Sequence, residues 1–417
     1  MRIGFFTSIE GWGGSEMYLK TMILSLRQHG DEPVLIGIQG TRLFEELQAE
    51  GAECIAWKNI EAQCGGVKAE DGHYYQSRPG QSPLTNSAKI FKSALLGLLP
   101  GWVKLLAGNM REVQHLRKVF SKSKLDVIQV NVHGYEVAGI AAKLEHIKDV
   151  GFFHTSPIDE PNKARRWLIR QTGRSYHRLC FPSKYTANSW VKILHVDPEL
   201  CNIVPYGIDI TRFMSLVTPC RNTSDPFRLV SVGRLHAMKG YPHLIDAIYE
   251  LKDERVSLDV LGEGPERGAL ARQISQLGLT ACVRLRGHIE NPEDIIKDAN
   301  AFIMLSNSQE SFGMAIVEAM ASGLPVITSS YGPFAEINEN GVTGFVVDVN
   351  NASEASKAIR TLVDDPDMCR VMGENGRQHA MDLYAKERMV LAMRKQYQKL
   401  VARIVVLRNA SDQRSSP

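Results

Sequence analysis

Two glutamates, Glu310 and Glu318, lie eight residues apart in the segment ESFGMAIVE. Glu310 follows a predicted buried strand, and Phe312-Gly313 opens a predicted helix whose first N–H groups have no partner inside the helix. A helix start attracts negative charge, and a carboxylate there can accept two hydrogen bonds from neighbouring hydroxyls of a sugar or ribose. A glutamate in an amphipathic helix is usually a solvated surface residue. Glu318 instead interrupts an apolar run, which favours a binding role.

Two cations follow a predicted strand in the segment SVGRLHAMKG, which contains Gly233, Arg234 and Lys239. Fixed cations and backbone N–H groups next to a helix start suit a diphosphate. A leaving nucleoside diphosphate gains negative charge as its bond breaks, so such cations would stabilise the transition state. Two surface cations on a loop remain the alternative interpretation.

Glycines and histidines give weaker signals near the ends of other predicted strands. Gly13 and Gly14 follow the first strand and open a helix, but the third glycine of a dinucleotide-binding pattern is missing. His133 and His154 each follow a strand and could hydrogen-bond a sugar hydroxyl or an acceptor. A single histidine after a strand is more often structural.

The elements that must position these residues alternate between short apolar runs and helical patterns. Such alternation over the whole length predicts an α/β fold with mostly parallel sheets. Ligands in these folds bind beyond the carboxyl ends of the strands. The predicted strands are Ile3–Thr7, Val34–Ile38, Val127–Val130, Val150–His154, Leu179–Phe181, Ile203–Val204, Arg228–Val232, Leu258–Leu261, Val283–Arg286, Ala301–Leu305, Pro325–Thr328 and Gly344–Val347. The predicted helices include Glu16–His29, Tyr241–Lys252, Pro265–Leu277 and Ala315–Ala321.

A chain of 417 residues exceeds what one hydrophobic core usually serves, so we expect two doubly wound domains across a cleft. The seam lies around 205–227, which gives a first domain at 1–210 and a second at 227–384. Residues 385–417 form a basic helix and tail that we expect to pack back across the domains.

An insert at about 61–119 breaks the alternation. Its part 89–119 is basic and amphipathic, includes Trp102, and is divided by Pro100-Gly101. It could dock on an anionic membrane surface, or it could form an ordinary packed helix pair with a basic solvent face.

Composition narrows the class of protein. A net charge of +3 is too small to indicate a nucleic-acid partner, and the seven cysteines show no paired short spacing. Scattered cysteines argue against a zinc site or a disulfide framework. The N-terminal segment does not resemble a signal peptide, and no apolar run reaches the roughly 20 residues of a membrane span. We therefore expect a cytoplasmic protein. Docking of the segment 89–119 would place it peripherally on the inner face of the plasma membrane.

Taken together, these motifs resemble glycosyltransferase family 4, the retaining group 1 enzymes with the two Rossmann-like domains of the GT-B fold. The motifs that carry the resemblance are Gly13-Gly14, VPYGID at 204–209, Gly233-Arg234 with Lys239-Gly240, LGEGP at 261–265, and Glu310 with Glu318. The resemblance covers nearly the whole chain.

The resemblance implies roles for individual residues. Arg234 and Lys239 would hold the donor diphosphate, Glu310 would orient the transferred sugar, and Glu318 would bind the ribose hydroxyls. The other donor-binding residues would be Gly13, Gly14, Gly233, Gly262, Ser311, Phe312, Gly313 and Met314. The family needs no divalent metal and no other cofactor, which agrees with the absence of an Asp-x-Asp signature from this sequence.

One departure from the family concerns its catalytic histidine. The matching stretch reads QVNVHG at 129–134, so either Asn131 or His133 takes that position. We assign this position to His133, because a glycine follows it, and place Asn131 and His154 on the acceptor side. The predicted catalytic residues are thus His133, Arg234, Lys239 and Glu310.

The predicted function is transfer of a hexosyl unit from a UDP- or GDP-sugar to a glycan or lipid-linked glycan, in the synthesis of a cell-surface polysaccharide or glycoconjugate. The alternatives are a nucleotide-sugar 2-epimerase, which shares the fold, and a non-catalytic sugar-nucleotide binding protein.

Overall fold

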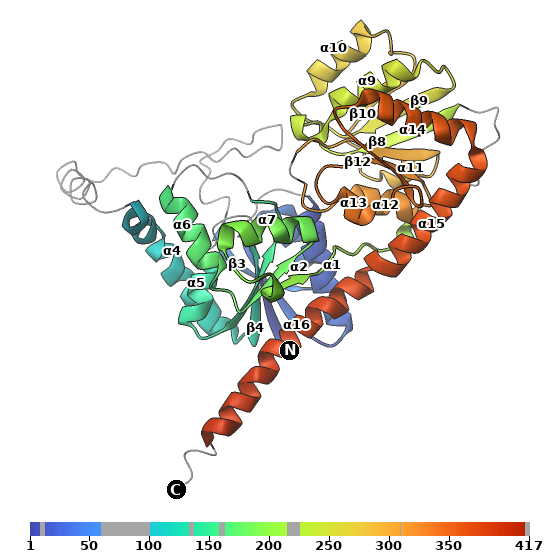
Figure 1. Cartoon of the computed structure of the whole chain (residues 1–417). Coiled ribbons are helices and arrows are strands. Elements are labelled where there is room, and N and C mark those ends of the chain that lie inside the picture. Colours follow the sequence, from blue (N-terminus) through green and yellow to red (C-terminus); the bar gives the residue numbers. More distant parts are fainter. Residues whose placement is uncertain are drawn as a thin grey trace, which may run out of the picture. The chain divides into compact units, whose positions relative to one another are not determined.

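A computed structural model describes residues 1–8, 13–59, 101–132, 137–157, 163–214, 226–308 and 310–412, with the backbone alone for 101–108, 164–165, 214 and 403–412. The chain divides into two compact units (Figure 1). Unit 1 contains Met1–Phe181, Ala187–Ile203 and Val390–Pro417. Unit 2 contains Pro182–Thr186 and Val204–Met389.

The elements alternate along the chain as the sequence predicts. The first half contains β1 (Arg2–Phe6), α1 (Gly14–Gln28), β2 (Glu32–Gln39), α2 (Arg42–Ala49), β3 (Glu53–Asn59), α4 (Gly101–Ser123), β4 (Val127–Val132), α5 (Val137–Leu144), β5 (Lys148–Phe153), α6 (Lys163–Gly173), β6 (Arg178–Phe181), α7 (Lys184–Leu194), η1 (Pro198–Leu200), β7 (Cys201–Ile203) and α8 (Thr211–Met214). The second half contains β8 (Phe227–Val232), η2 (Ala237–Lys239), α9 (Tyr241–Leu251), β9 (Val256–Leu261), α10 (Arg267–Gln276), β10 (Val283–Gly287), α11 (Glu293–Ile296), β11 (Ala301–Met304), α12 (Met314–Ala321), β12 (Val326–Ser329), α13 (Phe334–Ile337), β13 (Gly344–Val347), α14 (Ala352–Asp364), α15 (Pro366–Tyr384) and α16 (Lys386–Asp412).

Each unit is built on one parallel sheet, and the two sheets have equivalent strand orders. The order in unit 1 is β3-β2-β1-β4-β5-β6-β7, and the order in unit 2 is β10-β9-β8-β11-β12-β13. In each sheet the order reverses between two central strands, β1 and β4 in unit 1 and β8 and β11 in unit 2, and the carboxyl ends at such a reversal are where ligands of this fold class bind. The α/β fold class predicted from the sequence is confirmed.

The central strands form because their residues are mostly apolar and can be buried on both faces, as parallel strands between helices require. All six residues of β4 and all four residues of β11 and of β12 are buried. The strand β3 was not predicted. It is an edge strand in which the charged Glu53 and Lys58 are exposed while Trp57 is buried, so it lacks the continuous apolar run of the others.

The helix α4 begins at Gly101, where the Pro100-Gly101 break was predicted. Val113, Leu116 and Phe120 from its second half are buried in the core of unit 1, so this half is a packed helix. The predicted helix before Pro100 lies outside the described residues, as do the other residues of the insert at 60–100.

The part of α16 from Val390 onward belongs to unit 1, although it is more than 250 residues from β4 in the sequence. The hydroxyl of the fully buried Tyr397 donates to Gln129 Oε1 of β4 at 2.6 Å. Arg394 Nε donates to the buried Asp31 at 2.7 Å. These contacts make this part of the helix a component of the unit 1 core.

Among the described residues, no helix contains a segment long and apolar enough to cross a membrane. The cysteines within them, Cys54, Cys180, Cys201, Cys282 and Cys369, are free thiols.

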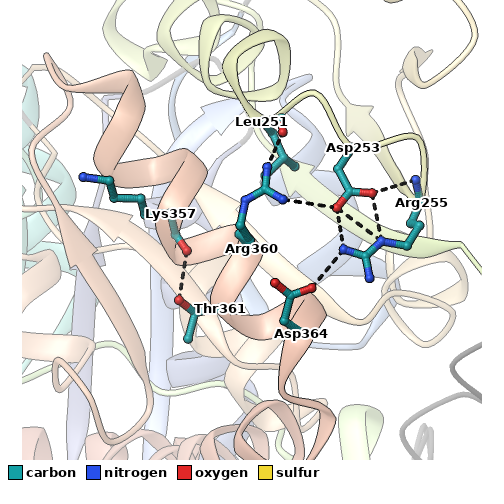
Figure 2. A network of polar contacts seen from close by, with 7 residues as sticks. All are labelled: Leu251, Asp253, Arg255, Lys357, Arg360, Thr361 and Asp364. Carbon is teal, nitrogen blue, oxygen red and sulfur yellow. Dashed lines mark hydrogen bonds and ion pairs between the residues drawn. The ribbon is translucent and has the colours of Figure 1, made fainter.

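A polar network in unit 2 fastens the turn between α9 and β9 to α14 (Figure 2). Asp253 accepts hydrogen bonds from the backbone N–H of Arg255 at 3.0 Å and from its guanidinium at 2.6 Å. Arg255 also donates to Asp364 of α14 at 2.9 Å, and Arg360 of α14 donates to the Leu251 carbonyl. The hydrogen bonds from Arg255 lower the pKa of Asp253 despite the opposing effect of burial.

The substitution Asp253→Asn should lower the stability of unit 2. Its side chain is 8% exposed and accepts several charge-assisted hydrogen bonds, but its partner Arg255 is exposed, so we expect a loss of about 1–2 kcal/mol. This corresponds to a fall in Tm of about 2–8 °C, measurable by thermal unfolding at neutral pH. The matched substitution Asp364→Asn, at a half-exposed carboxylate of the same network, should cost less than about 0.5 kcal/mol.

Because the folded pKa of Asp253 is lowered, its contribution is present above the ordinary value of 3.8 and is lost as the pH falls through the lowered pKa. The Tm difference between wild type and Asp253→Asn should therefore shrink at acidic pH. An equal difference at pH 7 and at the acid end would contradict this assignment.

Candidate functional site

The predicted cations of unit 2 and the carboxylate of Glu310 lie in the segments that follow two strands at the carboxyl end of its sheet. The loop after β8 carries Gly233, Arg234 and Lys239, and the loop after β11 carries Glu310. Because β8 and β11 are hydrogen-bonded neighbours on either side of the strand reversal, their loops leave the sheet side by side.

Two glycines, one in the loop after β8 and one in the loop after β9, let the loops at this end of the sheet approach one another closely. Gly240 has φ +64°, and a Cβ there would lie 1.8 Å from the Leu305 carbonyl oxygen. Gly262 has φ +142°, and a Cβ there would lie 2.0 Å from the Gly233 carbonyl oxygen. Only glycine adopts these conformations at such distances without displacing the neighbouring backbone. Gly262, predicted to bind the donor, therefore has a clear packing role against the loop that carries Arg234.

An ion pair joins the two loops. Lys239 Nζ lies 2.6 Å from Glu310 Oε1, and the two side chains are only 19% and 14% exposed. The Ser306 hydroxyl donates to the same carboxylate oxygen at 2.9 Å. The backbone beneath the ion pair is held by a hydrogen bond of 3.1 Å from Asn307 N to the Met238 carbonyl. The structure thus brings together two of the predicted catalytic residues.

Arg234 is exposed on the same loop, next to Gly233. The hydroxyl of Tyr241 donates to the Gly233 carbonyl at 3.0 Å, which fixes the loop from the first residue of α9. Burial raises the pKa of Tyr241 well above its usual range, so its hydroxyl remains a neutral donor. Arg234 is therefore an accessible cation on an anchored backbone.

The start of α12 is also fixed by its neighbours. The Ser311 carbonyl accepts hydrogen bonds from the Ser183 and Thr186 hydroxyls at 2.8 and 3.0 Å. The Phe312 ring is buried, with its centroid 5.2 Å from that of Tyr206 and 5.6 Å from that of Tyr384. The Phe312 ring therefore packs in the core of unit 2, between Tyr206 and Tyr384.

The helix α12 starts with Gly313 as its N-cap and Met314 as its first residue. Gly313 supplies no capping side chain, and its carbonyl accepts from Val317 N at 3.2 Å. The first N–H groups of a helix point away from its body and suit an anion, as the sequence predicts for this segment.

Glu318 lies in the second turn of α12, in a half-buried position. Burial raises its pKa to about 7; the nearby Glu293 adds to this rise, while Arg212 opposes it. Arg212 and Glu293 form an ion pair of their own at 2.5 Å. Glu318 is therefore a carboxyl group without a dominant cation, which suits hydrogen bonding to neutral hydroxyls better than binding a phosphate.

Gly13 and Gly14 belong to unit 1, where Gly13 is the N-cap of α1 and Gly14 its first residue. Sequence reasoning missed the neighbouring Glu16, which is 3% exposed. Burial raises its pKa, while hydrogen bonds from Ser15 and from the Glu16 and Gly13 N–H groups act against that rise. A glutamate at the third helical position that reaches back to the N-cap is half of a capping box. The usual Ser or Thr signal is absent because glycine is the N-cap.

The predicted acceptor-side residues Asn131 and His154 lie in the core of unit 1, at 0% and 2% exposure. Asn131 Nδ2 donates to the Phe6 carbonyl at 2.7 Å, so its Oδ1 faces the Gln129 amide at 2.7 Å and the His154 ring at 2.6 Å. His154 is therefore a buried, hydrogen-bonded side chain, which agrees with the structural interpretation given above as the alternative to acceptor binding. His133, predicted to be catalytic, lies outside the described residues.

Within the parts of the chain that the structure describes, no three His, Cys, Asp or Glu side chains group closely enough to hold a metal ion.

The comparison with known proteins agrees with these features. The family model described as Glycosyltransferase Family 4 matches residues 12–212, and the model described as Glycosyl transferases group 1 matches residues 221–379. Anabaena HepE, solved in complex with UDP, superimposes with a TM-score of 0.73 at 18% identity, over 96% of this chain and 100% of that one.

Two curated relatives illustrate the range of activities. The chain is 26% identical over 249 residues to the MMP alpha-(1->4)-mannosyltransferase of Mycolicibacterium hassiacum, which covers 58% of this chain and 59% of the relative. It is 32% identical over 162 residues to the lipopolysaccharide core biosynthesis glycosyltransferase LpsE of Rhizobium meliloti, which covers 38% and 46% of the two chains. The matches thus span about half the length of these relatives.

The two parallel sheets and the match to HepE define the GT-B fold. With one model matching its first half and the other its second, the chain belongs to glycosyltransferase family 4, in the group 1 glycosyl transferases.

The raised pKa of Glu318 predicts a pH-dependent stability. Between pH 4.5 and about 7 the folded protein keeps a proton that the unfolded chain has lost, so the free energy of unfolding falls as the pH rises through this window. The substitution Glu318→Gln removes this penalty. Because the side chain is only half-buried, the gain above pH 7 should be about 1–2 kcal/mol, or about 2–8 °C in Tm.

Thermal unfolding at a series of pH values tests this prediction. The Tm gain of Glu318→Gln should be near zero at the acid end of the window and largest above its upper end. The exposed Glu339→Gln is the control and should show no such trend. A gain that does not change with pH would show that Glu318 is not the titrating group.

Proposed function

We propose that this protein is a retaining glycosyltransferase that moves a hexosyl unit from a UDP- or GDP-sugar to a glycan or lipid-linked glycan acceptor. Family membership supports the reaction class, and the UDP bound to HepE supports a nucleoside diphosphate donor. The names of the mannosyltransferase and of LpsE support a hexose donor and a role in glycoconjugate synthesis.

The observation that carries this proposal is the ion pair between Lys239 and Glu310 beside the start of α12. A nucleotide sugar presents an anionic diphosphate next to a neutral hexose. Lys239, the accessible Arg234 and the first N–H groups of α12 suit the diphosphate. Glu310 suits the hexose hydroxyls, and Glu318 suits the ribose hydroxyls.

We propose that transfer takes place on one face of the sugar. The acceptor hydroxyl oxygen bonds to the anomeric carbon on the side from which the diphosphate leaves, so the configuration is retained. The bond between the anomeric carbon and the phosphate oxygen breaks with its electron pair on the phosphate. The hydroxyl proton passes to that oxygen, and Arg234 and Lys239 stabilise the negative charge that develops there.

The charge of the leaving group is balanced in this proposal by side chains and backbone N–H groups alone. We therefore expect no requirement for a divalent metal, so activity should persist in excess EDTA.

The donor and the reaction are tested together with nucleotide sugars. A thermal-shift screen of UDP-, GDP- and ADP-sugars should give one large stabilisation, because a ligand at 100 times its Kd adds about 2.7 kcal/mol. The selected donor is then incubated with and without a glycan acceptor panel. Transfer with retained anomeric configuration supports the proposal. An epimerised nucleotide sugar without acceptor, or binding without any turnover, would replace it with an epimerase or a binding protein.

The substitutions Arg234→Ala and Lys239→Ala should each lower kcat about 10²–10³-fold, because each removes a preorganised charge from the leaving group. Steady-state kinetics with the cognate donor measures this loss. Lys357→Ala, at an exposed lysine of α14, is the matched control and should keep wild-type kcat. Near-normal kcat in a folded Arg234→Ala or Lys239→Ala variant would remove that residue from the proposed mechanism.

A further inference from the structure

Ser306 lies two residues beyond the end of β11 and is fully buried. Its hydroxyl donates to Glu310 Oε1 at 2.9 Å. Its carbonyl accepts a hydrogen bond of 2.6 Å from the hydroxyl of Ser329, the last residue of β12, which is also fully buried. Ser306 is thus held from the neighbouring strand while its own side chain holds Glu310.

Glu310 Oε1 receives two donors of different kinds. Lys239 Nζ, at 2.6 Å, ends a flexible side chain with rotatable bonds, and Ser306 Oγ sits on a fixed backbone. The diphosphate of a nucleotide sugar carries more charge than one carboxylate, so it competes for Lys239 but not for the buried neutral hydroxyl of Ser306.

We propose that Ser306 is a positioning residue that keeps the Glu310 carboxylate aimed at the donor sugar once Lys239 has turned to the diphosphate. This inference rests on the proposed function. It assigns a role to a residue between strand and loop that has no charge and does not itself contact the donor.

The surrounding backbone makes this role physically sound. The Gly240 approach to the Leu305 carbonyl and the Asn307–Met238 hydrogen bond fix the chain on both sides of Ser306. A hydroxyl on a fixed backbone loses little conformational entropy when it orders a carboxylate. Without it, the Glu310 carboxylate would be less restricted once its lysine partner has left.

The role predicts a difference between two ligands that share the nucleotide. When Ser306 no longer restricts Glu310, the glutamate side chain must be ordered as the sugar binds, so Ser306→Ala should weaken binding of the nucleotide sugar about tenfold. Binding of the corresponding nucleoside diphosphate, which lacks the sugar, should stay within about twofold of wild type. Transfer should lose kcat as well, because the sugar is less well oriented.

The experiment measures the Kd of the cognate nucleotide sugar and of its nucleoside diphosphate by calorimetry, for wild type, Ser306→Ala and Ser356→Ala. Ser356→Ala is the matched control, because it removes the hydroxyl of a buried serine on α14 that contacts neither Ser306 nor Glu310 in the hydrogen bonds described above. It should leave the ratio of the two Kd values unchanged. If Ser306→Ala does not fold, Ser306→Cys keeps a side chain of similar size with a much weaker donor.

A changed ratio in the Ser306 variant alone supports the proposal. An unchanged ratio, or the same change in both variants, overturns it while the proposed function stands. A wild-type protein that binds no nucleotide sugar contradicts the proposed function itself.

Discussion

The carboxylate of Glu310 sits where a cation and a buried hydroxyl meet at the end of β11. A carboxylate that is mostly removed from water needs such partners, because an unpaired buried charge is strongly destabilising. Lys239 neutralises it, and Ser306 fixes its direction. When a ligand draws Lys239 away, it must bring compensating interactions, and a diphosphate attached to a hexose brings both an anion for the lysine and hydroxyls for the carboxylate.

The strands and loops of unit 2 hold Lys239, Ser306 and Glu310 close to one another. Because β8 and β11 are parallel, their carboxyl ends lie at the same edge of the sheet. Gly240 allows its backbone to approach Leu305 closely, and Gly262 allows the same approach to Gly233. Glu318 lies in α12, the helix that follows Glu310, and burial raises its pKa because the nearby Arg212 offsets this effect only in part. The proposed site therefore has a cationic part for phosphate and a less charged part for hydroxyl groups. Lys239 lies beside Glu310 in the first part, and Glu318 belongs to the second.

Unit 1 has an equivalent strand order, but polar side chains of its central strands hydrogen-bond one another in the core. Gln129, Asn131 and His154 hydrogen-bond one another at the end of β4 and β5, and Tyr397 joins them from α16. Each amide has its orientation set by its partners, so these side chains form a satisfied polar core. The part of α16 from Val390 onward contributes to that core, which explains why this basic C-terminal segment forms a helix packed in unit 1.

The central strands and the segment around Glu310 and Glu318 could be predicted from the sequence. Short apolar runs predict the central strands, and a glutamate and a Phe-Gly pair between an apolar run and a helical pattern predict the turn from β11 into α12. β3 was missed because an edge strand with exposed Glu53 and Lys58 has no such run. The roles of Ser306 and Glu16 depend on which atoms meet after folding, and a serine or glutamate carries no periodic signal for that. For the same reason His154, which looked accessible after a strand, proved to be buried against Asn131.

In the proposed donor complex, Lys239 leaves Glu310 for the donor diphosphate while Ser306 stays with Glu310. A crystal structure of the complex with the nucleotide sugar that stabilises the protein most tests it directly. We expect Lys239 Nζ at about 2.7–2.9 Å from a phosphate oxygen, and Ser306 Oγ still hydrogen-bonded to a Glu310 carboxylate that contacts the hexose. A complex in which Lys239 remains on Glu310 and the diphosphate binds elsewhere would contradict it.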